Sequence, residues 1–362
     1  MQADIKEMAL EATTLLESLI RIPSISREEK EAADHLQNYM EEVGLETGRD
    51  GNNVWSLSPC FDLSKPTILL NSHLDTVKPT SSWIRDPFTP SWENGRLYGL
   101  GSNDAGASLC SLLQVFRALS RTAQSFNTIF LASAEEEVSG KGGMEHVRDL
   151  LPPFQVALVG EPTGNQPAIA EKGLMVLDVT ARGKSGHAAR NEGVNAIYEA
   201  LDDICWFRDY QFEKVSPLLG PVKMSVTVIH AGTQHNVIPD TCTFMVDVRS
   251  NECYSNEEIC QIIRSQVKGQ VSAHSFRLGS SSISVEHPIV QRALAMGLKP
   301  FGSPTLSDQA LLRCPSMKMG PGQSSRSHTA DEYILLSEIQ EGIERYWDLL
   351  NCLSFPFSPV KG

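Results

Sequence analysis

The chain has 362 residues, which is enough for about two domains that each bury their own core. Hydrophobic residues make up 41% and charged residues 21%, as in soluble globular proteins, and no apolar run approaches the roughly 18–20 residues that span a bilayer. The net charge of −13 argues against binding to nucleic acid or to an anionic membrane surface, because both require a basic protein surface.

The chain is expected to begin with an amphipathic helix over residues 5–20. This segment lacks the basic-then-apolar layout of a secretory signal. The eight cysteines form no Cys-x-x-Cys pair and show no disulfide spacing. We therefore expect free thiols and a cytoplasmic location.

The first half of the chain alternates helix-like and strand-like segments. A second helix is expected over residues 27–43, closed by Gly44, and a buried helix over residues 107–119. The expected strands are short apolar runs at residues 53–57, 67–70, 128–131 and 156–159. Strands that alternate with helices predict a three-layer α/β fold around a mainly parallel sheet.

After residue 173 the pattern changes to that of a small α+β domain. The expected elements are strand 174–181, helix 195–207, strand 223–230, strand 242–249, helix 256–268 and a weaker strand near 282–286. This β-α-β-β-α-β order is the split-βαβ arrangement. Since helix, strand and helix patterns return after residue 287, we predict a domain of residues 174–286 inserted into a discontinuous α/β domain of residues 1–173 and 287–362.

Polar side chains follow three of the expected strands. His73 and Asp75 follow the second strand, three glutamates at 135–137 follow the third, and Glu161 follows the fourth. Asp104 stands just before the buried helix. Ligands of open α/β sheets bind at the carboxyl ends of the strands, so these groups should meet at one edge. Taken singly, each fits a solvated loop or charge run, but together they indicate a divalent-metal site of the zinc, cobalt or manganese kind.

His328 is the remaining candidate ligand. Thr329 and Glu332 have the spacing of a capping box, which predicts that a helix begins there and that His328 lies at its entry. On the local sequence alone, an exposed loop histidine is the simpler interpretation.

Seven ordered motifs resemble the dinuclear-zinc deacylase and exopeptidase family, which contains acetylornithine deacetylase, succinyl-diaminopimelate desuccinylase and glutamate carboxypeptidase. The motifs are HLDTV, GLGSNDAGAS, SAEEEVSGKGG, GEPT, GKSGHAARNEGVNAI, HNVIPD and SRSHTADEYI. They run over nearly the whole chain, and the acetylornithine deacetylase branch is the most similar. The resemblance implies a zinc-exopeptidase-like catalytic domain with an inserted lid and dimerisation domain.

Carried over residue by residue, the resemblance implies a site for two Zn²⁺ ions, which Co²⁺ can replace. The implied ligands are His73, Asp104, Glu136, Glu161 and His328. Asp104 would bridge the two ions, and the two histidines would bind different ions. Asp75 is implied as the carboxylate that orients His73 or the general base.

The resemblance also implies the catalytic and substrate-binding groups. Glu135 would be the general base that takes a proton from the attacking water and returns it to the leaving amine. Glu135 and Glu136 can both face the site only if the chain leaves strand geometry there. His187 would act from the partner subunit on the oxyanion, and Asn236 would contact the substrate or the oxyanion. Arg249 would hold the α-carboxylate of the substrate, with a salt bridge inside the inserted domain as the alternative. Ser307, Asp308 and Arg326 are further candidates for reading the amino-acid side chain.

The expected function is removal of an N-acyl group from an amino acid of arginine biosynthesis. N-acetyl-L-ornithine is the first candidate, followed by N-succinylornithine and by N-acetyl- or N-succinylcitrulline. A dipeptidase or carboxypeptidase would use the same catalytic groups and is the alternative within the enzyme class. A non-catalytic metabolite-binding scaffold is the alternative outside it. We expect a homodimer formed through the inserted domain.

Overall fold

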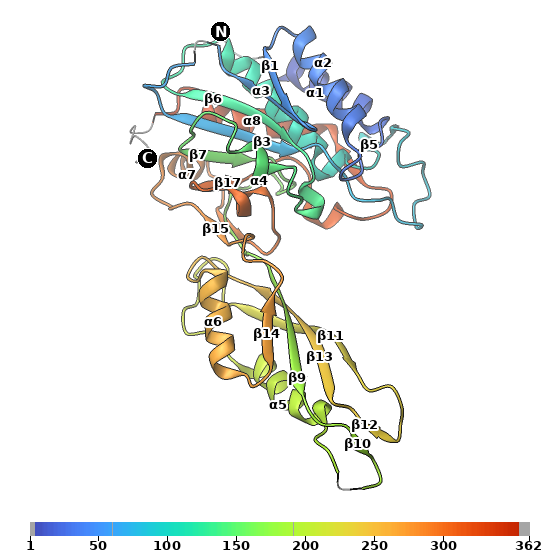
Figure 1. Ribbon diagram of the computed structural model, residues 1–362. Coiled ribbons are helices and arrows are strands. Elements are labelled where there is room, and N and C mark those ends of the chain that lie inside the picture. Colours follow the sequence, from blue (N-terminus) through green and yellow to red (C-terminus); the bar gives the residue numbers. More distant parts are fainter. Residues whose placement is uncertain (1–3, 60, 191, 355–362) are drawn as a thin grey trace. The chain divides into compact units, whose positions relative to one another are not determined.

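The computed structural model describes residues 4–59, 61–190 and 192–354, which fall into two compact units (Figure 1). The large unit comprises Met1–Ile169, Ile283–Phe301 and Ser307–Gly362. The inserted unit comprises Ala170–Ser282 and Gly302–Leu306. The corresponding boundaries expected from the sequence are 173/174 and 286/287.

The large unit is built on a mixed sheet whose strand order is β1-β2-β6-β3-β7-β17-β8. The strands are β1 (Thr47–Asp50), β2 (Asn53–Leu57), β3 (Thr67–His73), β6 (Asn127–Ser133), β7 (Val156–Val159), β8 (Ala168–Glu171) and β17 (Ser316–Lys318). The four central strands β6, β3, β7 and β17 are parallel, and pairing at both ends of the sheet is antiparallel. The α/β prediction is confirmed, and the carboxyl ends of the parallel strands meet at one edge.

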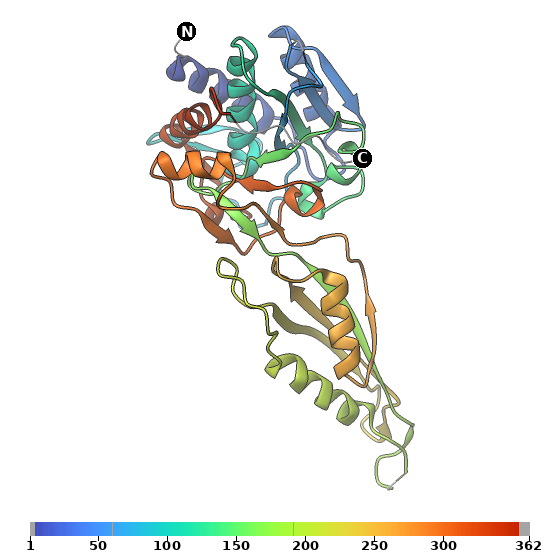
Figure 2. The ribbon, with the colours of Figure 1, turned by 90° about the vertical axis from the view of Figure 1, so that its left-hand side faces the viewer.

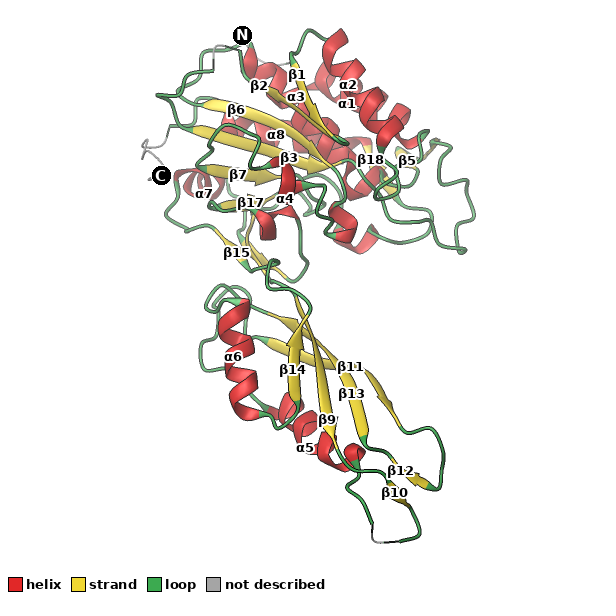
Figure 3. Cartoon of the chain, viewed as in Figure 1, coloured by secondary structure: helices red, strands yellow, loops and turns green. Residues whose placement is uncertain are grey.

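The large unit has six α-helices among its described residues, some on the sheet and some on other helices (Figure 3). They are α1 (Ile5–Ile20), α2 (Lys30–Glu42), α3 (Ala107–Ser120), α4 (Met144–Val147), α7 (Pro288–Ala295) and α8 (Leu336–Leu350). Helix α3 lies on β3 and β6, and both α1 and α8 pack against α3. Helix α1 begins where the Asp4 carboxylate accepts two backbone N–H groups, each at 3.1 Å. Leu16, Phe116 and Tyr346 are among the side chains that fill the core between these helices and the sheet.

A small three-stranded sheet joins two segments that lie far apart in the sequence. Strand β5 (Arg96–Tyr98) pairs with β4 (Ser91–Glu93) on one side and with β18 (Tyr333–Leu335) on the other. The helix predicted to begin at Thr329 is therefore wrong, because β18 intervenes and α8 begins at Leu336. The Thr329 hydroxyl instead donates to the Arg326 carbonyl at 2.8 Å.

The inserted unit is a four-stranded antiparallel sheet in the order β11-β13-β9-β14, with two helices on one of its faces (Figure 2). Its elements are β9 (Met175–Arg182), α5 (Ala196–Asp209), β11 (Lys223–Ala231), β13 (Thr241–Arg249), α6 (Asn256–Gln266) and β14 (Gln270–Ala273). The fourth strand predicted near residues 282–286 is wrong. Residues 270–273 take that place because Val271 is buried in the core of this unit, whereas β15 (Ser281–Ser282) pairs with β8.

Two expectations from composition concern membranes and thiols. Within the described ranges, no helix combines the length and apolarity needed to cross a membrane. The cysteines that the structure describes are free thiols. Burial raises the pKa of the Cys314 thiol to about 12, so this cysteine stays protonated near neutral pH and is a poor nucleophile.

Candidate active site

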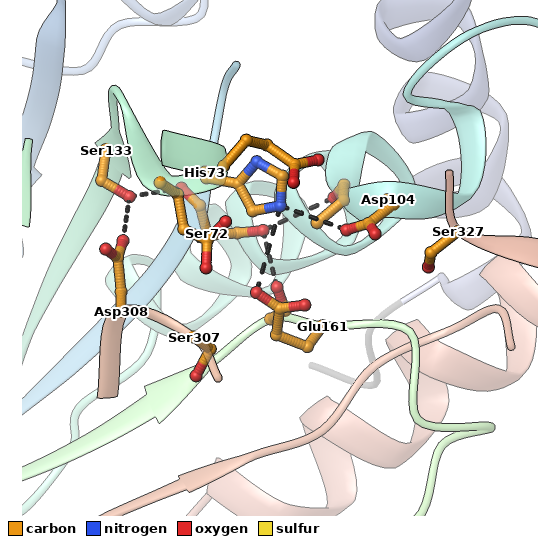
Figure 4. A network of polar contacts seen from close by, with 12 residues as sticks. Ser72, His73, Asp104, Ser133, Glu161, Ser307, Asp308 and Ser327 are labelled. Carbon is orange, nitrogen blue, oxygen red and sulfur yellow. Dashed lines mark hydrogen bonds and ion pairs between the residues drawn. The ribbon is translucent and has the colours of Figure 1, made fainter. Parts of the chain in front are cut away.

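The candidate groups of the large unit gather at the carboxyl edge of the parallel strands. His73 is the last residue of β3, and Glu161 follows β7 directly after a glycine. Asp104 lies in the loop between β5 and α3, and His328 precedes β18. The side chains of His73, Asp104 and Glu161 point toward one another (Figure 4). These three groups therefore meet at one edge of the sheet, as the strand-end argument predicts.

Asp104 lies between two groups of possible metal ligands. On one side, its Oδ1 is 3.2 Å from His73 Nε2, which is 4.0 Å from Glu161 Oε1. On the other side, its Oδ2 is 3.7 Å from His328 Nε2, which is 2.9 Å from Glu137 Oε2. Ligand atoms of His73, Asp104 and Glu137 all lie within 4.8 Å of one another. This arrangement suits two cations that share one carboxylate.

The acidic turn after β6, residues 134–138, leaves strand geometry at Glu135. This residue is left-handed, with φ 56°, and Glu136 and Glu137 follow in a short 3₁₀ helix, Glu136–Val138. The Glu135 carboxylate accepts the Gly142 N–H at 3.4 Å and lies 3.9 Å from Arg27 Nε. Glu136 and Glu137, rather than Glu135 and Glu136, are thus the two acids beside the other candidate ligands. Because the sequence has three consecutive glutamates here, it does not indicate which two of them face the other candidate ligands.

Asp75 contacts both the acidic turn and His73. Its carboxylate accepts the N–H groups of Glu136 and Glu137 at 3.0 and 3.1 Å and a hydrogen bond from the Ser26 hydroxyl at 2.6 Å. Its backbone carbonyl is 2.9 Å from His73 Nδ1, and because a carbonyl can only accept, Nδ1 must carry the proton. Nε2 is therefore the ring nitrogen that faces Asp104 and Glu161.

Glu332 holds the backbone that presents Asp104. Its carboxylate accepts the N–H groups of Asn103 and Asp104 at 2.7 and 2.9 Å, and that of Gly101 at 3.2 Å. Burial, and then the charge of Asp104, raise the pKa of Glu332 to about 8. Sequence reasoning assigned Glu332 to a helix cap and missed this role, although its place in the SRSHTADEYI motif was the available signal.

The buried charges suit a divalent cation. Burial, and then the charge of Asp104, raise the pKa of Glu161 to about 8. Burial alone would lower the pKa of His73, but its hydrogen bond with Asp104 and other nearby carboxylates raise it well above the usual value. The contact with Glu137 raises the pKa of His328 to about 9. Without a metal ion, bound protons thus reduce the repulsion between these acids. Imidazole together with carboxylate is the donor set that zinc, cobalt or manganese prefers.

Burial also acts strongly on Glu136. It raises the pKa of this carboxyl well above its ordinary value, and the charges of Glu161, Asp308 and Glu137 act in the same direction. Asp308 is itself buried and accepts a hydrogen bond from the Ser133 hydroxyl (Figure 4). Glu136 is therefore a carboxylate with an enhanced affinity for a proton beside the candidate ligands.

The inserted unit carries the other predicted site residues. His187 ends β10 (Gly186–His187), and Asn236 directly precedes β12 (Val237–Ile238), which pairs with β10. The Asn236 carbonyl accepts the N–H of the residue after His187 at 3.0 Å, so the two lie on one ribbon. Arg249 makes two contacts with the Asp247 carboxylate, at 2.8 and 3.1 Å. This contact is the salt-bridge alternative, and the substrate-binding role of Arg249 stays a prediction.

Arg326 is occupied by contacts within the large unit. Its guanidinium forms a bidentate pair with Glu338 at 2.7 and 2.9 Å and lies 4.4 Å from the centre of the Tyr333 ring. These contacts anchor the segment before His328 to α8, so the structure favours a structural role for Arg326 over recognition of the substrate.

Comparisons with known proteins identify the family of this chain. The model of peptidase family M20/M25/M40 matches residues 69–351. An acetylornithine deacetylase from Shigella sonnei is 26% identical over 351 residues, covering 88% of this chain and 91% of that protein. One from Pectobacterium carotovorum is 28% identical over 290 residues, covering 75% and 76%.

Solved structures of the same fold include a Staphylococcus aureus tripeptidase, with a TM-score of 0.75 and 19% identity, covering 95% of this chain and 98% of that one. A dinuclear-metal-binding peptidase from Bacillus subtilis has a TM-score of 0.72 and 16% identity, covering 96% and 98%. Since the family model spans more than half of its length, this chain belongs to peptidase family M20/M25/M40 and is a metal-dependent hydrolase.

Proposed function

We propose that the protein hydrolyses the amide bond of an N-acyl-L-amino acid in arginine biosynthesis. N-acetyl-L-ornithine is the first candidate, and N-succinylornithine and the N-acetyl and N-succinyl derivatives of citrulline come next. The observation that carries the proposal is the double donor set around Asp104 with the buried Glu136 beside it. Similarity to two curated acetylornithine deacetylases, over 88% and 75% of this chain, supports the substrate class.

The candidate ligands on the two sides of Asp104 would form two metal positions. His73 and Glu161 would hold one ion, His328 and Glu137 the other, and Asp104 both. Zinc, or cobalt in its place, would lower the pKa of the attacking water and polarise the scissile carbonyl. The Asp75 carbonyl holds the Nδ1–H of His73, so Nε2 is the nitrogen that would bind the ion once its own proton has left.

Glu136, rather than Glu135, would be the general base. It accepts the proton of the attacking water, and the raised pKa of its buried carboxyl lets it keep that proton until the leaving amine nitrogen receives it. Glu135 does not suit this role because its carboxylate is turned toward Gly142 and Arg27.

A panel of substrates tests the proposed reaction. Protein loaded with zinc or cobalt is assayed for amine release from N-acetylornithine, N-acetylcitrulline, their N-succinyl counterparts and several dipeptides. We expect a clear preference for one acylated ornithine or citrulline. Cleavage of dipeptides alone would replace this proposal by the dipeptidase or carboxypeptidase alternative. Two bound metal ions with no cleavage of any compound in the panel would favour the alternative of a non-catalytic metabolite-binding scaffold.

The inserted unit would form a homodimer and supply groups to the substrate. Its helix α5 lies against the edge strand β11, and both expose apolar side chains. Tyr198 and Leu201 of α5 are 68% and 48% exposed, and Ile229 of β11 is 52% exposed. A second copy of this chain would cover such a surface. His187 would then stabilise the oxyanion in the partner's site, with Asn236 beside it.

Mixed dimers test this use of His187. We expect His187→Ala to lower kcat by about 10²- to 10³-fold, the effect of removing one oxyanion donor, with metal content unchanged. Combined with a Glu136→Gln subunit, it should recover part of the activity because one site in the dimer then has both groups. Demonstrably mixed dimers that stay inactive would exclude action across subunits.

A further inference from the structure

The acidic turn is held by a row of side-chain acceptors. Four consecutive backbone N–H groups, those of residues 134–137, each donate to a side-chain oxygen. The pairs are Ala134 to Asn53 Oδ1 at 3.0 Å, Glu135 to Glu29 Oε1 at 3.2 Å, Glu136 to Asp75 Oδ1 at 3.0 Å and Glu137 to Asp75 Oδ2 at 3.1 Å. Glu29 and Asn53 are 0% exposed and Asp75 is 1% exposed.

Glu29 binds the left-handed residue at which the turn leaves the strand. Its Oε1 accepts the N–H of Glu135 and also that of Arg27, the latter at 2.6 Å. Its Oε2 accepts the Asn52 amide at 2.9 Å. A buried carboxylate is costly unless such donors surround it, so these contacts define where its oxygens lie.

Asn53 joins the start of the acidic turn to the end of the loop that follows it. Its Oδ1 accepts the N–H of Ala134, and its Nδ2 donates to the Gly142 carbonyl at 2.7 Å. The Glu135 side chain fills the space inside this loop, and a Cβ on Gly140 would lie 1.9 Å from its carboxylate. The glycine at position 140 therefore leaves room for the Glu135 carboxylate, which lies inside this loop.

We propose that Glu29 is a positioning residue of the metal centre, which acts by holding the N–H of Glu135 and so directing Glu136 and Glu137 into the site. Left-handed backbone is sparsely populated by residues other than glycine, and extended backbone would send Glu136 and Glu137 to opposite faces. Glu29 precedes residue 69, where the family match begins. The inference rests on the roles proposed above for Glu136 and Glu137.

Metal titration of the metal-free full-length protein tests this role. In Glu29→Ala, we expect one equivalent of Zn²⁺ to bind as in the wild type and the other to bind about 10- to 100-fold more weakly. A loss of this size is usual when a residue that positions a metal ligand is removed. The weakened position is that of Glu137, because Glu137 belongs to the turn, whereas His73 ends β3 and Glu161 follows β7. Glu29→Gln keeps one oxygen for the Glu135 N–H and should restore binding to within about threefold.

Hydrogen exchange and matched variants separate positioning from a loss of fold. Exchange in a peptide covering residues 134–142 should increase in Glu29→Ala and not in Glu28→Ala, which alters an exposed neighbour. If Glu29→Ala does not fold, Glu29→Asp is the second variant, because it keeps the charge on a shorter side chain. It should also bind only one of the two Zn²⁺ equivalents more weakly. Two wild-type equivalents in folded Glu29→Ala, or an equal loss of both, would overturn the inference. Neither result depends on substrate, so failure of the proposed reaction would appear separately in the amine-release panel.

Discussion

Replacing Glu136 by glutamine is expected to lower kcat by about 10³- to 10⁴-fold while both metal ions stay bound. Glutamine keeps the shape of the side chain but cannot accept the proton of the attacking water. The matched control is Glu135→Gln, which alters a carboxylate that contacts Gly142 and faces Arg27. Its kcat should stay within about threefold of the wild type, because the proposed assignment gives Glu135 no part in the proton transfer.

The two variants together decide which glutamate is the base. Turnover on the best substrate of the panel, with metal content measured on the same samples, is the required comparison. A large loss in Glu135→Gln with a nearly normal Glu136→Gln would restore the roles implied by the motif alone. Loss of one metal in Glu136→Gln would instead make Glu136 a ligand.

Replacing Asp104 by asparagine is expected to weaken both metal positions, and turnover should fall with them. Each carboxylate oxygen of Asp104 faces a different histidine, so one substitution affects both donor groups. The loss for each ion should exceed the about 10- to 100-fold that follows removal of an outer partner. Glu161→Gln and Glu137→Gln should each weaken one position only. Equal behaviour of all three variants in a two-site titration would contradict a shared carboxylate.

Thermal unfolding of the metal-free proteins provides the control for Glu161→Gln. Burial raises the pKa of Glu161 to about 8 from 4.5, so the folded state favours the protonated form. The contribution of this group to stability is therefore greatest at low pH and falls as pH rises from about 4.5 through 8. Glu161→Gln should match the wild type near pH 5 and be more stable near pH 9. A variant that is less stable at both values would indicate damage to the fold.

Much of the site follows from the strand ends. His73 and Glu161 lie within three residues after apolar runs, and parallel strands carry such residues to a common edge. The acidic turn could not be read in the same way. Which two of its three glutamates lie beside the other candidate ligands depends on the φ angle of Glu135, and the N–H of this residue is held by Glu29 from a distant segment.

The two wrong predictions of secondary structure, the helix at Thr329 and the strand at residues 282–286, have the same cause. Thr329 and Glu332 match a helix cap locally, yet the Glu332 carboxylate has three backbone N–H donors around Asp104 and does not cap a helix. Residues 282–286 match a strand locally, but Ile283 packs into the core of the large unit. Val271 packs into the core of the inserted unit, and its segment takes the edge of that sheet. In both cases a partner far along the chain decided the outcome.

The position of Glu332 in the chain constrains when the site can form during synthesis. A nascent chain emerges from the ribosome with its N-terminus first, so residues 101–104 are made long before the carboxylate that fixes their backbone. His328 also arrives late, after the whole inserted unit. A product that stops before residue 328 contains His73, Asp104, Glu137 and Glu161 but lacks the second histidine and the acceptor for the Asp104 loop. On the proposed assignment, the complete set of metal ligands therefore forms only when translation is almost finished, and we expect chains that stop before residue 328 to be inactive.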